Sequence, residues 1–523
     1  MNPLLFPVLI VALLMVISPH TQPAAPTFNE PWRPQFHFTP ERNWMNDPNG
    51  LVFFEGEYHL FYQYNPFGDQ WGHMSWGHAI SRDLVRWEHL PVALPETNSV
   101  MAFSGSAVVD HQNTSGFGSP GKPPLVAIYT AHHTDRPLQN QFIAYSTDRG
   151  RTWTTYEGNP VLDIGAADFR DPKVFWHEPS ERWIMTVAWP VERKIRFYAS
   201  TNLKAWSHLS DFGPAGSTQG IWECPDLFPL RIEGGAKGDQ AWVLVVNVGS
   251  GAPAGGSGCQ YFVGRFDGTR FVRSTIPGSK GPSPALWADF GRDFYAAVSW
   301  SDIPPRDGRR IWLGWMSNWE YAQDVPTTPW RSAMTVPREL HLRPTPVGLR
   351  LIQQPVRELE SLRIRGTSRT LRRTSVSEAN DWLDEARFPE GLADLTVAFQ
   401  PARAAARYGL AIQTGPDEVT TLLADPETGH LQLDRRRSGE TNFHGKFPEV
   451  FQAPFRLDRG RWSVRVLVDA SSLEVFVNGG EVALTSLIFP KTGRKDLHFR
   501  ILGNDDVAKV TSLETHALTR SWP

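Results

Sequence analysis

The chain has 523 residues, too many for one hydrophobic core, so we expect two or three domains. Its 52 Lys and Arg residues nearly balance 55 Asp and Glu residues, giving a formal net charge of −3. Because the two signs are interspersed, the composition argues against nucleic acid or an anionic membrane surface as a partner.

The N-terminal residues, 1–25, have the pattern of a signal peptide. Residues 4–17 are apolar apart from Pro7, and a stretch of small residues ends near Ala25. Such a run is too short to span a bilayer but suits the apolar region of a signal peptide. We therefore expect a secreted protein, extracellular or periplasmic, with no stable membrane insertion after cleavage. A retained anchor is the alternative, because residues 1–3 contain no Lys or Arg.

Residues 26–352 predict a five-bladed β-propeller. The segment divides into five units, each with four candidate strands rich in β-branched and aromatic residues and bounded by Gly, Pro, Asn or Asp. Four strands repeated every 50 to 70 residues, roughly, are typical of propeller blades, and helical periodicity is nearly absent. The expected strands are 51–54, 58–64, 76–81 and 87–94; 103–110, 125–131, 141–147 and 152–156; 173–176, 183–189, 195–200 and 206–209; 226–230, 242–248, 260–266 and 270–274; 294–300, 311–315, 331–336 and 348–352.

Acidic motifs recur where these units begin. Asp47, Ser104, Asp171, Glu223 and Asp289 each lie at or near the first strand of successive units. Because the innermost strands of a propeller converge on its axis, we expect these residues to meet. A pair of carboxylates is the minimum equipment for cleaving a glycosidic bond. The sequence therefore predicts a sugar hydrolase.

Each motif also has a purely structural interpretation. Residues 47–50 form a strong β-turn sequence, and Arg170 beside Asp171 fits a local ion pair. Glu223 has apolar neighbours on both sides, which disfavours its ionised form, as a general acid requires. The recurrence of the motifs at one place in different repeats favours the catalytic interpretation.

The remaining chain predicts a linker and a second β domain. We assign 353–370 to the linker, with a short helix at 356–362, and 371–523 to a β-sandwich. A tight hairpin turn is expected at 478–480. Paired acids are not evident there, so we expect a stabilising or binding role. The expected strands are 395–399, 409–413, 419–424, 431–433, 462–468, 473–477 and 482–489.

The cysteines and histidines give no sign of a metal or other cofactor. Cys224 and Cys259 are the only cysteines, too few for a disulfide framework, and Cys224 is expected to pack beneath the site. The histidines are scattered rather than clustered at metal-ligand spacing. Asn113 opens a glycosylation acceptor sequence, which is equally a chance tripeptide.

Several motifs together resemble glycoside hydrolase family 32, the β-fructofuranosidases that include invertases, inulinases and levanases. The resemblance spans nearly the whole chain after the signal peptide, and residues 71–95 and 222–228 look most like exo-acting levanases and exo-inulinases. The motifs that carry it are 44–50, 58–64, 71–78, 103–106, 169–172, 222–226, 312–319 and, in the second domain, 469–476.

This resemblance implies a role for each site residue. Asp47 would be the nucleophile at the anomeric carbon of a terminal fructosyl unit, and Glu223 the general acid/base. Asp171 would stabilise the transition state, with Arg170 fixing it. The family is retaining, so the Asp47 and Glu223 carboxyls should lie about 5–5.5 Å apart. The residues placed around the sugar are Asn46, Gln63, Trp71, Phe103, Ser104, Arg170 and Trp315.

The expected substrate is a fructan or sucrose, and alternatives remain for the reaction. A fructosyltransferase would use the same three acids and pass the fructosyl unit to a sugar. An endo-acting fructanase would need an open cleft. A fructan-binding propeller protein without catalysis, or a pentosidase on the same fold, fits the motifs less well. The oligomeric state and the preference among levan, inulin and sucrose are not evident from the sequence.

Overall fold

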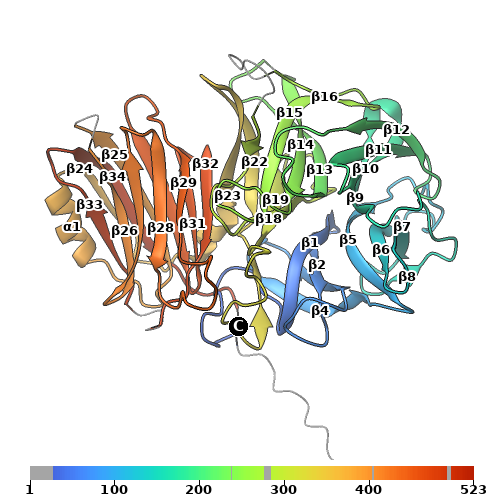
Figure 1. Cartoon of the computed structure of the whole chain (residues 1–523), viewed down its shortest axis with the longest axis horizontal. Helices are drawn as coiled ribbons and strands as arrows, with labels where there is room; N and C mark the ends of the chain where they lie inside the picture. The colour runs from blue at the N-terminus through green and yellow to red at the C-terminus, as the bar shows by residue number, and fades with distance from the viewer. Residues whose placement is uncertain (1–27, 237, 276–283, 403–405, 492–495, 523) are drawn as a thin grey trace, which may run out of the picture.

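The computed structural model describes residues 28–236, 238–275, 284–402, 406–491 and 496–522. The expected signal peptide, 1–25, lies outside the described residues. Figure 1 shows two β units side by side, a ring of radiating sheets and a sandwich of two stacked sheets. The predicted all-β architecture, a five-bladed propeller followed by a β-sandwich, is confirmed. In the described part of the chain, no helix combines the length and apolar character needed to cross a membrane.

The propeller contains five sheets, and each begins with its innermost strand. The first holds β1 (Asn43–Phe54), β2 (Glu57–Tyr64), β3 (Ser75–Ser81) and β4 (Trp87–Leu94). The second holds β5 (Val100–Val109), β6 (Leu125–His133), β7 (Leu138–Ser146) and β8 (Thr154–Thr155). The third holds β9 (Arg170–His177), β10 (Arg182–Trp189), β11 (Lys194–Ser200) and β12 (Ser207–Phe212), with η1 (Glu178–Ser180) between β9 and β10. The fourth holds β13 (Trp222–Arg231), β14 (Gln240–Val248), β15 (Gly258–Phe266), β16 (Phe271–Arg273) and β17 (Leu286–Trp287). The fifth holds β18 (Tyr295–Ser299), β19 (Arg310–Met316), β21 (Ala333–Met334), β22 (Arg338–Thr345) and β23 (Gly348–Pro355).

The innermost strands form a closed ring. β1 contacts β5, β5 contacts β9, β9 contacts β13, β13 contacts β18, and β18 contacts β1 again. The ring is also closed by β20 (Trp330–Arg331), which comes from the fifth unit but pairs in parallel with the start of β1. Residues far apart in sequence are thereby brought to one axis.

Each innermost strand is irregular at the same end. Register shifts interrupt its pairing near Asp47 in β1, Ser104 in β5, Asp171 in β9, Cys224 in β13 and Ala296 in β18. A β-bulge bends the strand and redirects a side chain. The five bulges therefore turn side chains of the central strands away from the regular alternation at one end of the ring.

Two expectations for the fifth blade are wrong. Residues 331–336 are not its third strand: they include only the short β21, with part of β20, and β22 takes the expected place. Asp289 does not lie on an innermost strand either, because β17, just before it, pairs with β15 of the fourth sheet. Its carboxylate instead accepts hydrogen bonds from Thr485 of the sandwich (2.7 and 2.8 Å) and from Arg338 (3.1 Å).

The second unit is a sandwich of a six-stranded and a five-stranded sheet. The 3-10 helix η2 (Arg357–Leu362) forms where a short linker helix was expected. The six-stranded sheet has the order β24 (Arg369–Thr374), β34 (Ala508–Ala517), β25 (Ala393–Pro401), β30 (Trp462–Asp469), β31 (Ser472–Val477) and β32 (Val482–Leu487). The five-stranded sheet has the order β29 (Val450–Pro454), β28 (His430–Arg437), β27 (Glu418–Asp425), β26 (Tyr408–Gly415) and β33 (His498–Leu502).

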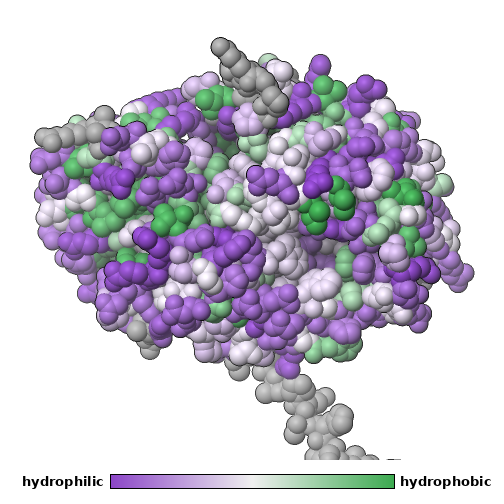
Figure 2. Space-filling model, in the orientation of Figure 1, coloured by the Kyte–Doolittle hydropathy of each residue, from purple (hydrophilic) through white to green (hydrophobic). Residues whose placement is uncertain are grey.

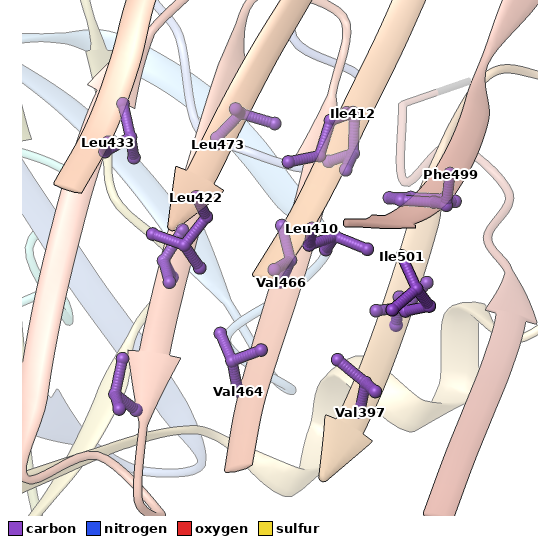
Figure 3. Close-up of a cluster of buried hydrophobic side chains, with 14 of the residues drawn as sticks. Val397, Leu410, Ile412, Leu422, Leu433, Val464, Val466, Leu473, Phe499 and Ile501 are labelled. Atoms are coloured by element: carbon purple, nitrogen blue, oxygen red, sulfur yellow. The ribbon is translucent and has the colours of Figure 1, made fainter. Parts of the chain in front are cut away.

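Alternating apolar residues from both sheets fill the sandwich core. Val397, Leu410, Leu422 and Val466, which are at most 1% exposed, lie between the sheets (Figure 3). The helix α1 (Val376–Asp384), which the sequence analysis did not predict, packs against β33. The predicted turn at 478–480 joins β31 to β32, and all three of its residues have positive φ.

Candidate active site

Three carboxylates from three blades meet around Cys224. Asp47 lies on β1, Asp171 on β9 and Glu223 on β13, directly before Cys224. The Cys224 thiol donates to Asp47 Oδ2 at 3.4 Å and lies 3.6 Å from Asp171 Oδ2. The backbone N–H of Cys224 donates to the same Asp171 oxygen at 2.9 Å. The bulge at Cys224, where φ is +44°, gives the backbone and the side chain of one residue a place in the cluster.

Asp47 is held by two neutral donors in addition to the Cys224 thiol. Its Oδ2 accepts a hydrogen bond from the Ser104 hydroxyl at 2.7 Å, and its Oδ1 accepts one from Asn46 Nδ2 at 3.1 Å. Burial raises the pKa of Asp47, the Ser104 hydrogen bond lowers it, and the nearby Glu223 charge raises it further. A carboxylate without a cation in its own hydrogen-bond shell keeps its negative charge available for a developing positive centre.

Asp171 occupies a left-handed backbone conformation. Its φ is +67°, and its backbone N–H donates to the Thr130 hydroxyl at 2.8 Å. Burial raises the pKa of Asp171 to about 7, although the Arg170 charge lowers it, because Glu223 and Asp47 add to the increase. Backbone strain of this kind concentrates at functional sites.

Glu223 is the most open of the three acids and the one paired with a cation. Its side chain is 18% exposed. Oε1 accepts from Arg170 Nε at 3.1 Å and Nη2 at 3.0 Å, and Oε2 accepts from the Tyr295 hydroxyl. Arg170 was expected to fix Asp171, yet its guanidinium binds Glu223. The Arg170 charge still acts on Asp171, whose pKa it lowers.

The predicted sugar-binding residues surround the acids in different ways. Asn46 and Ser104 touch Asp47 directly, and Gln63 donates to the Ala102 carbonyl at 2.9 Å. Trp71 is 40% exposed and meets the Phe103 ring edge to face, with centroids 6.1 Å apart. These aromatic faces are available to the C–H surface of a sugar.

Trp315 differs from the expectation. It is fully buried, with its ring 4.8 Å from that of Trp319 and 6.0 Å from that of Trp44. It therefore supports the wall of the site from behind.

Several residues that position the acids were not predicted from the sequence. Tyr295, at the start of β18, occupies the place on the fifth innermost strand for which Asp289 was expected. Gln139 accepts from Arg170 Nη1 at 3.2 Å and from the Phe169 backbone at 2.9 Å. Asn247 donates to the Cys224 carbonyl at 2.9 Å. One signal could have identified Tyr295: it stands at the start of the fifth innermost strand, where the other innermost strands carry their site residues.

Within the described ranges, no group of three or more His, Cys, Asp or Glu side chains is arranged to hold a metal ion. The three acids are separated instead by the thiol of Cys224 and by the Arg170 guanidinium. The arrangement supports proton transfer and nucleophilic attack by carboxylates.

Comparisons with known proteins agree with this geometry. The family model for the glycosyl hydrolases family 32 N-terminal domain matches residues 37–355, and the model for the C-terminal domain of that family matches 358–517. A levanase of Bacillus subtilis is 47% identical over 99% of this chain and 75% of its own length. An extracellular exo-inulinase of Aspergillus ficuum is 39% identical over 95% of this chain and 96% of its own.

A solved structure agrees in fold as well as in sequence. The crystal structure of the exo-inulinase from Aspergillus awamori superposes with a TM-score of 0.86 at 37% identity, covering 95% of this chain and all of that one. The family models and both relatives extend over propeller and sandwich alike. This chain is a glycoside hydrolase and belongs to glycosyl hydrolases family 32.

Proposed function

We propose that this chain is a retaining exo-β-fructosidase, which releases terminal fructosyl units from levan and inulin and also cleaves sucrose. The observation that carries the proposal is the grouping of Asp47, Asp171 and Glu223 around Cys224, with a different hydrogen-bond environment for each acid. Two carboxylates with separate environments suit the two roles of a retaining mechanism. The names of the relatives, levanase and exo-inulinase, support the substrate class.

The first step forms a covalent intermediate. Asp47 attacks C2 of the terminal fructosyl unit as the bond from C2 to the leaving oxygen breaks. Glu223 gives its proton to that oxygen, so the leaving sugar departs as a neutral alcohol. The positive charge that develops on the fructosyl ring is stabilised by the Asp47 carboxylate.

The second step returns the enzyme to its starting state. Glu223, now ionised, removes a proton from water, and the oxygen of that water attacks C2. The bond between C2 and Asp47 breaks, and Asp47 leaves as a carboxylate. Asp171 accepts hydrogen bonds from fructosyl hydroxyls in both steps, while Arg170 and Tyr295 hold Glu223 in place. This mechanism predicts a separation of about 5–5.5 Å between the two catalytic carboxyls.

The test is a product time course with purified protein on levan, inulin and sucrose. We expect fructose as the only early product from both polymers, with the relative rates giving the preferred substrate. A ladder of oligosaccharides would identify an endo-acting enzyme, and larger sugars at high sucrose a transferase. The Glu223→Gln variant is the control for contaminating hydrolases and should release no fructose.

We also propose that residues 1–25 are removed on secretion. The apolar stretch at 4–17 supports this, as does the name of the extracellular exo-inulinase relative. N-terminal sequencing of protein recovered from the culture medium should begin near residue 26. Recovery of the intact N-terminus from the membrane fraction would favour the retained anchor.

A further inference from the structure

A second pocket opens at the opposite end of the propeller ring from the three acids. Its volume is about 540 Å³, within the range of small-molecule sites. Lys173 and Asp226 line it, two and three residues beyond Asp171 and Glu223 on the same innermost strands, β9 and β13. The pocket is therefore separate from the site already described, although the same strands build both.

Four charged side chains of both signs line the inner part of this pocket. They are Lys173, Arg310, Asp226 and Asp302. Lys173 Nζ lies 3.7 Å from Asp226 Oδ2 and also donates to the Ser299 carbonyl. Arg310 Nη1 donates to the Trp300 carbonyl at 3.1 Å and to the Ser299 hydroxyl at 3.5 Å, and the guanidinium lies over the Phe228 ring, 5.3 Å from its centroid. Its remaining guanidinium donors are available to a ligand.

The carboxylates retain acceptor capacity. Asp226 Oδ2 accepts from the Ser299 backbone at 2.7 Å and its Oδ1 from the Leu227 backbone at 2.8 Å. Asp302 Oδ2 accepts from the Val109 backbone at 3.0 Å, and its Oδ1 lies 3.5 Å from His111 Nε2. Each carboxylate oxygen can accept two hydrogen bonds. The pocket thus offers donors and acceptors together, with charges of both signs, and Glu178 adds a further carboxylate to its lining.

Aromatic side chains form the outer wall. The residues Trp176 and Trp242 are partly exposed, and the Phe175 ring lies 5.8 Å from that of Trp242. The Trp183 indole behind them is tied to Thr114 at 2.9 Å. Flat apolar faces beside hydrogen-bonding groups match the two kinds of surface on a sugar. The side of the molecule turned to the viewer in Figure 1 is mostly hydrophilic, with hydrophobic residues in small groups (Figure 2).

We propose that this pocket is a second sugar-binding site, which takes a neutral mono- or disaccharide. An anion such as phosphate would face the carboxylates of Asp226 and Asp302, and an apolar ligand would take the place of water beside four charged groups without giving them hydrogen bonds of its own. A neutral polyol satisfies the donors of Lys173 and Arg310 as well as the two acceptors. The choice of fructose and sucrose as its sugars rests on the proposed function.

Fluorine NMR of protein labelled with 5-fluorotryptophan tests the site directly. The Glu223→Gln variant serves as the background, because it should not hydrolyse the sucrose probe. The resonances of Trp176 and Trp242 are assigned by replacing each with Phe, and Trp71 reports separately on the active site. We expect fructose and sucrose to shift the Trp176 and Trp242 resonances with a saturable dependence on concentration.

Pocket variants make the test specific. Arg310→Gln should weaken fructose binding at the pocket by about tenfold or more, the cost of a hydrogen bond from a charged donor. Asp302→Asn is a second variant that keeps the left-handed backbone (φ +61°) accessible and should weaken binding in the same direction. Arg265→Gln, an exposed arginine on β15 outside the pocket, is the matched control and should change nothing.

Several results would overturn the proposal. They are shifts confined to Trp71, equal shifts in the Glu223→Gln protein with and without either pocket substitution, or a response to inorganic phosphate without one to fructose. Failure of the proposed function would appear elsewhere, as absence of hydrolysis by the wild-type protein, so the two are distinguishable.

Discussion

The hydrogen bond from Ser104 to Asp47 sets the charge of the proposed nucleophile. Asp47 must be ionised to attack C2, and burial raises its pKa while Ser104 lowers it. Activity should therefore disappear as pH falls through this raised pKa, at a higher pH than for an ordinary aspartate.

Removing the Ser104 hydroxyl should shift the acidic limb. In Ser104→Ala the neutral form of Asp47 gains relative stability, so the acidic limb of kcat/KM should move up by about 0.5 to 1 pH unit, the equivalent of one hydrogen bond. Ser106→Ala is the control, because that hydroxyl lies two residues along β5 and accepts from the Val174 backbone instead. An unchanged limb in Ser104→Ala, or an equal shift in both variants, would show that Ser104 does not control this ionisation.

Most single residues of the site can be predicted from the sequence, but their hydrogen-bond partners cannot. The acids and Ser104 were predicted because each opens a repeat and carries chemistry of its own. Tyr295 and Gln139 were missed, because a tyrosine or glutamine gains its role only from the neighbour that folding supplies. Asp289 was assigned to the wrong place for the same reason: an aspartate near a strand does not reveal which sheet that strand joins.

The bulged inner strands are the elements that build the site. The bulge at Asp171 imposes an unfavourable backbone conformation. Its φ of +67° is tolerated better by Asn or Asp than by other residues that carry a Cβ. Replacement should therefore separate the backbone role from the carboxylate role.

Two substitutions of Asp171 make this separation. Asp171→Asn and Asp171→Ala should both lose most activity, but Asp171→Ala should be less stable than Asp171→Asn by roughly 1–2 kcal/mol. Asn can keep both the left-handed backbone and the hydrogen bond from the Cys224 N–H. The same pair of changes at Asp47, which has no positive φ, gives the reference for ordinary side-chain loss. Chemical denaturation measures the differences. Equal Asn-to-Ala differences at the two positions would contradict a backbone role for Asp171.

At the level of elements, periodicity predicted strands well and their pairing less well. The alternation of residues located nearly every blade strand, and η2 formed where a short helix was expected. The exchange of β20 into the first sheet could not be predicted, because it depends on closure of the ring rather than on local sequence. The helix α1 did carry a local signal, a capping box formed by Ser375 and Glu378.

Propeller and sandwich are joined by a buried network of charges. His37, which precedes β1, contacts Asp469 at 2.7 Å and Glu474 at 2.8 Å, both from the sandwich. Arg338 of the propeller also binds Glu474, with Nε to Oε2 at 3.0 Å. Residues 469–476 were identified from the sequence as a family motif, but no role was assigned to them. The structure places two of its acids at the junction of the two units.

This junction predicts a dependence of stability on pH. Burial lowers the pKa of His37, but the hydrogen bonds and charges of Asp469 and Glu474 raise it to about 9, above the ordinary value of 6.5. The charged His37 and its two carboxylate partners therefore stabilise the fold fully below about pH 6.5. This stabilisation is lost as pH rises through about 9. The unfolding temperature should fall over this interval.

The His37→Gln variant isolates the contribution. It should unfold at a lower temperature than wild type at pH 6, with a smaller difference at pH 9, because a neutral side chain loses no proton in this range. His73→Gln, at an exposed histidine of the propeller, is the control. Calorimetry at pH 6, 7.5 and 9 measures the effect. A difference that did not shrink toward pH 9 would contradict a charged His37.

The most direct test of the catalytic assignment is the turnover of Asp47→Asn, measured beside Glu223→Gln on sucrose and levan with unfolding temperature as the check on folding. Each change leaves the size of the side chain nearly unaltered and removes one catalytic group. We expect kcat to fall by at least about a thousandfold in both variants, with a wild-type fold. A folded Asp47→Asn protein with wild-type kcat would show that Asp47 is not the nucleophile.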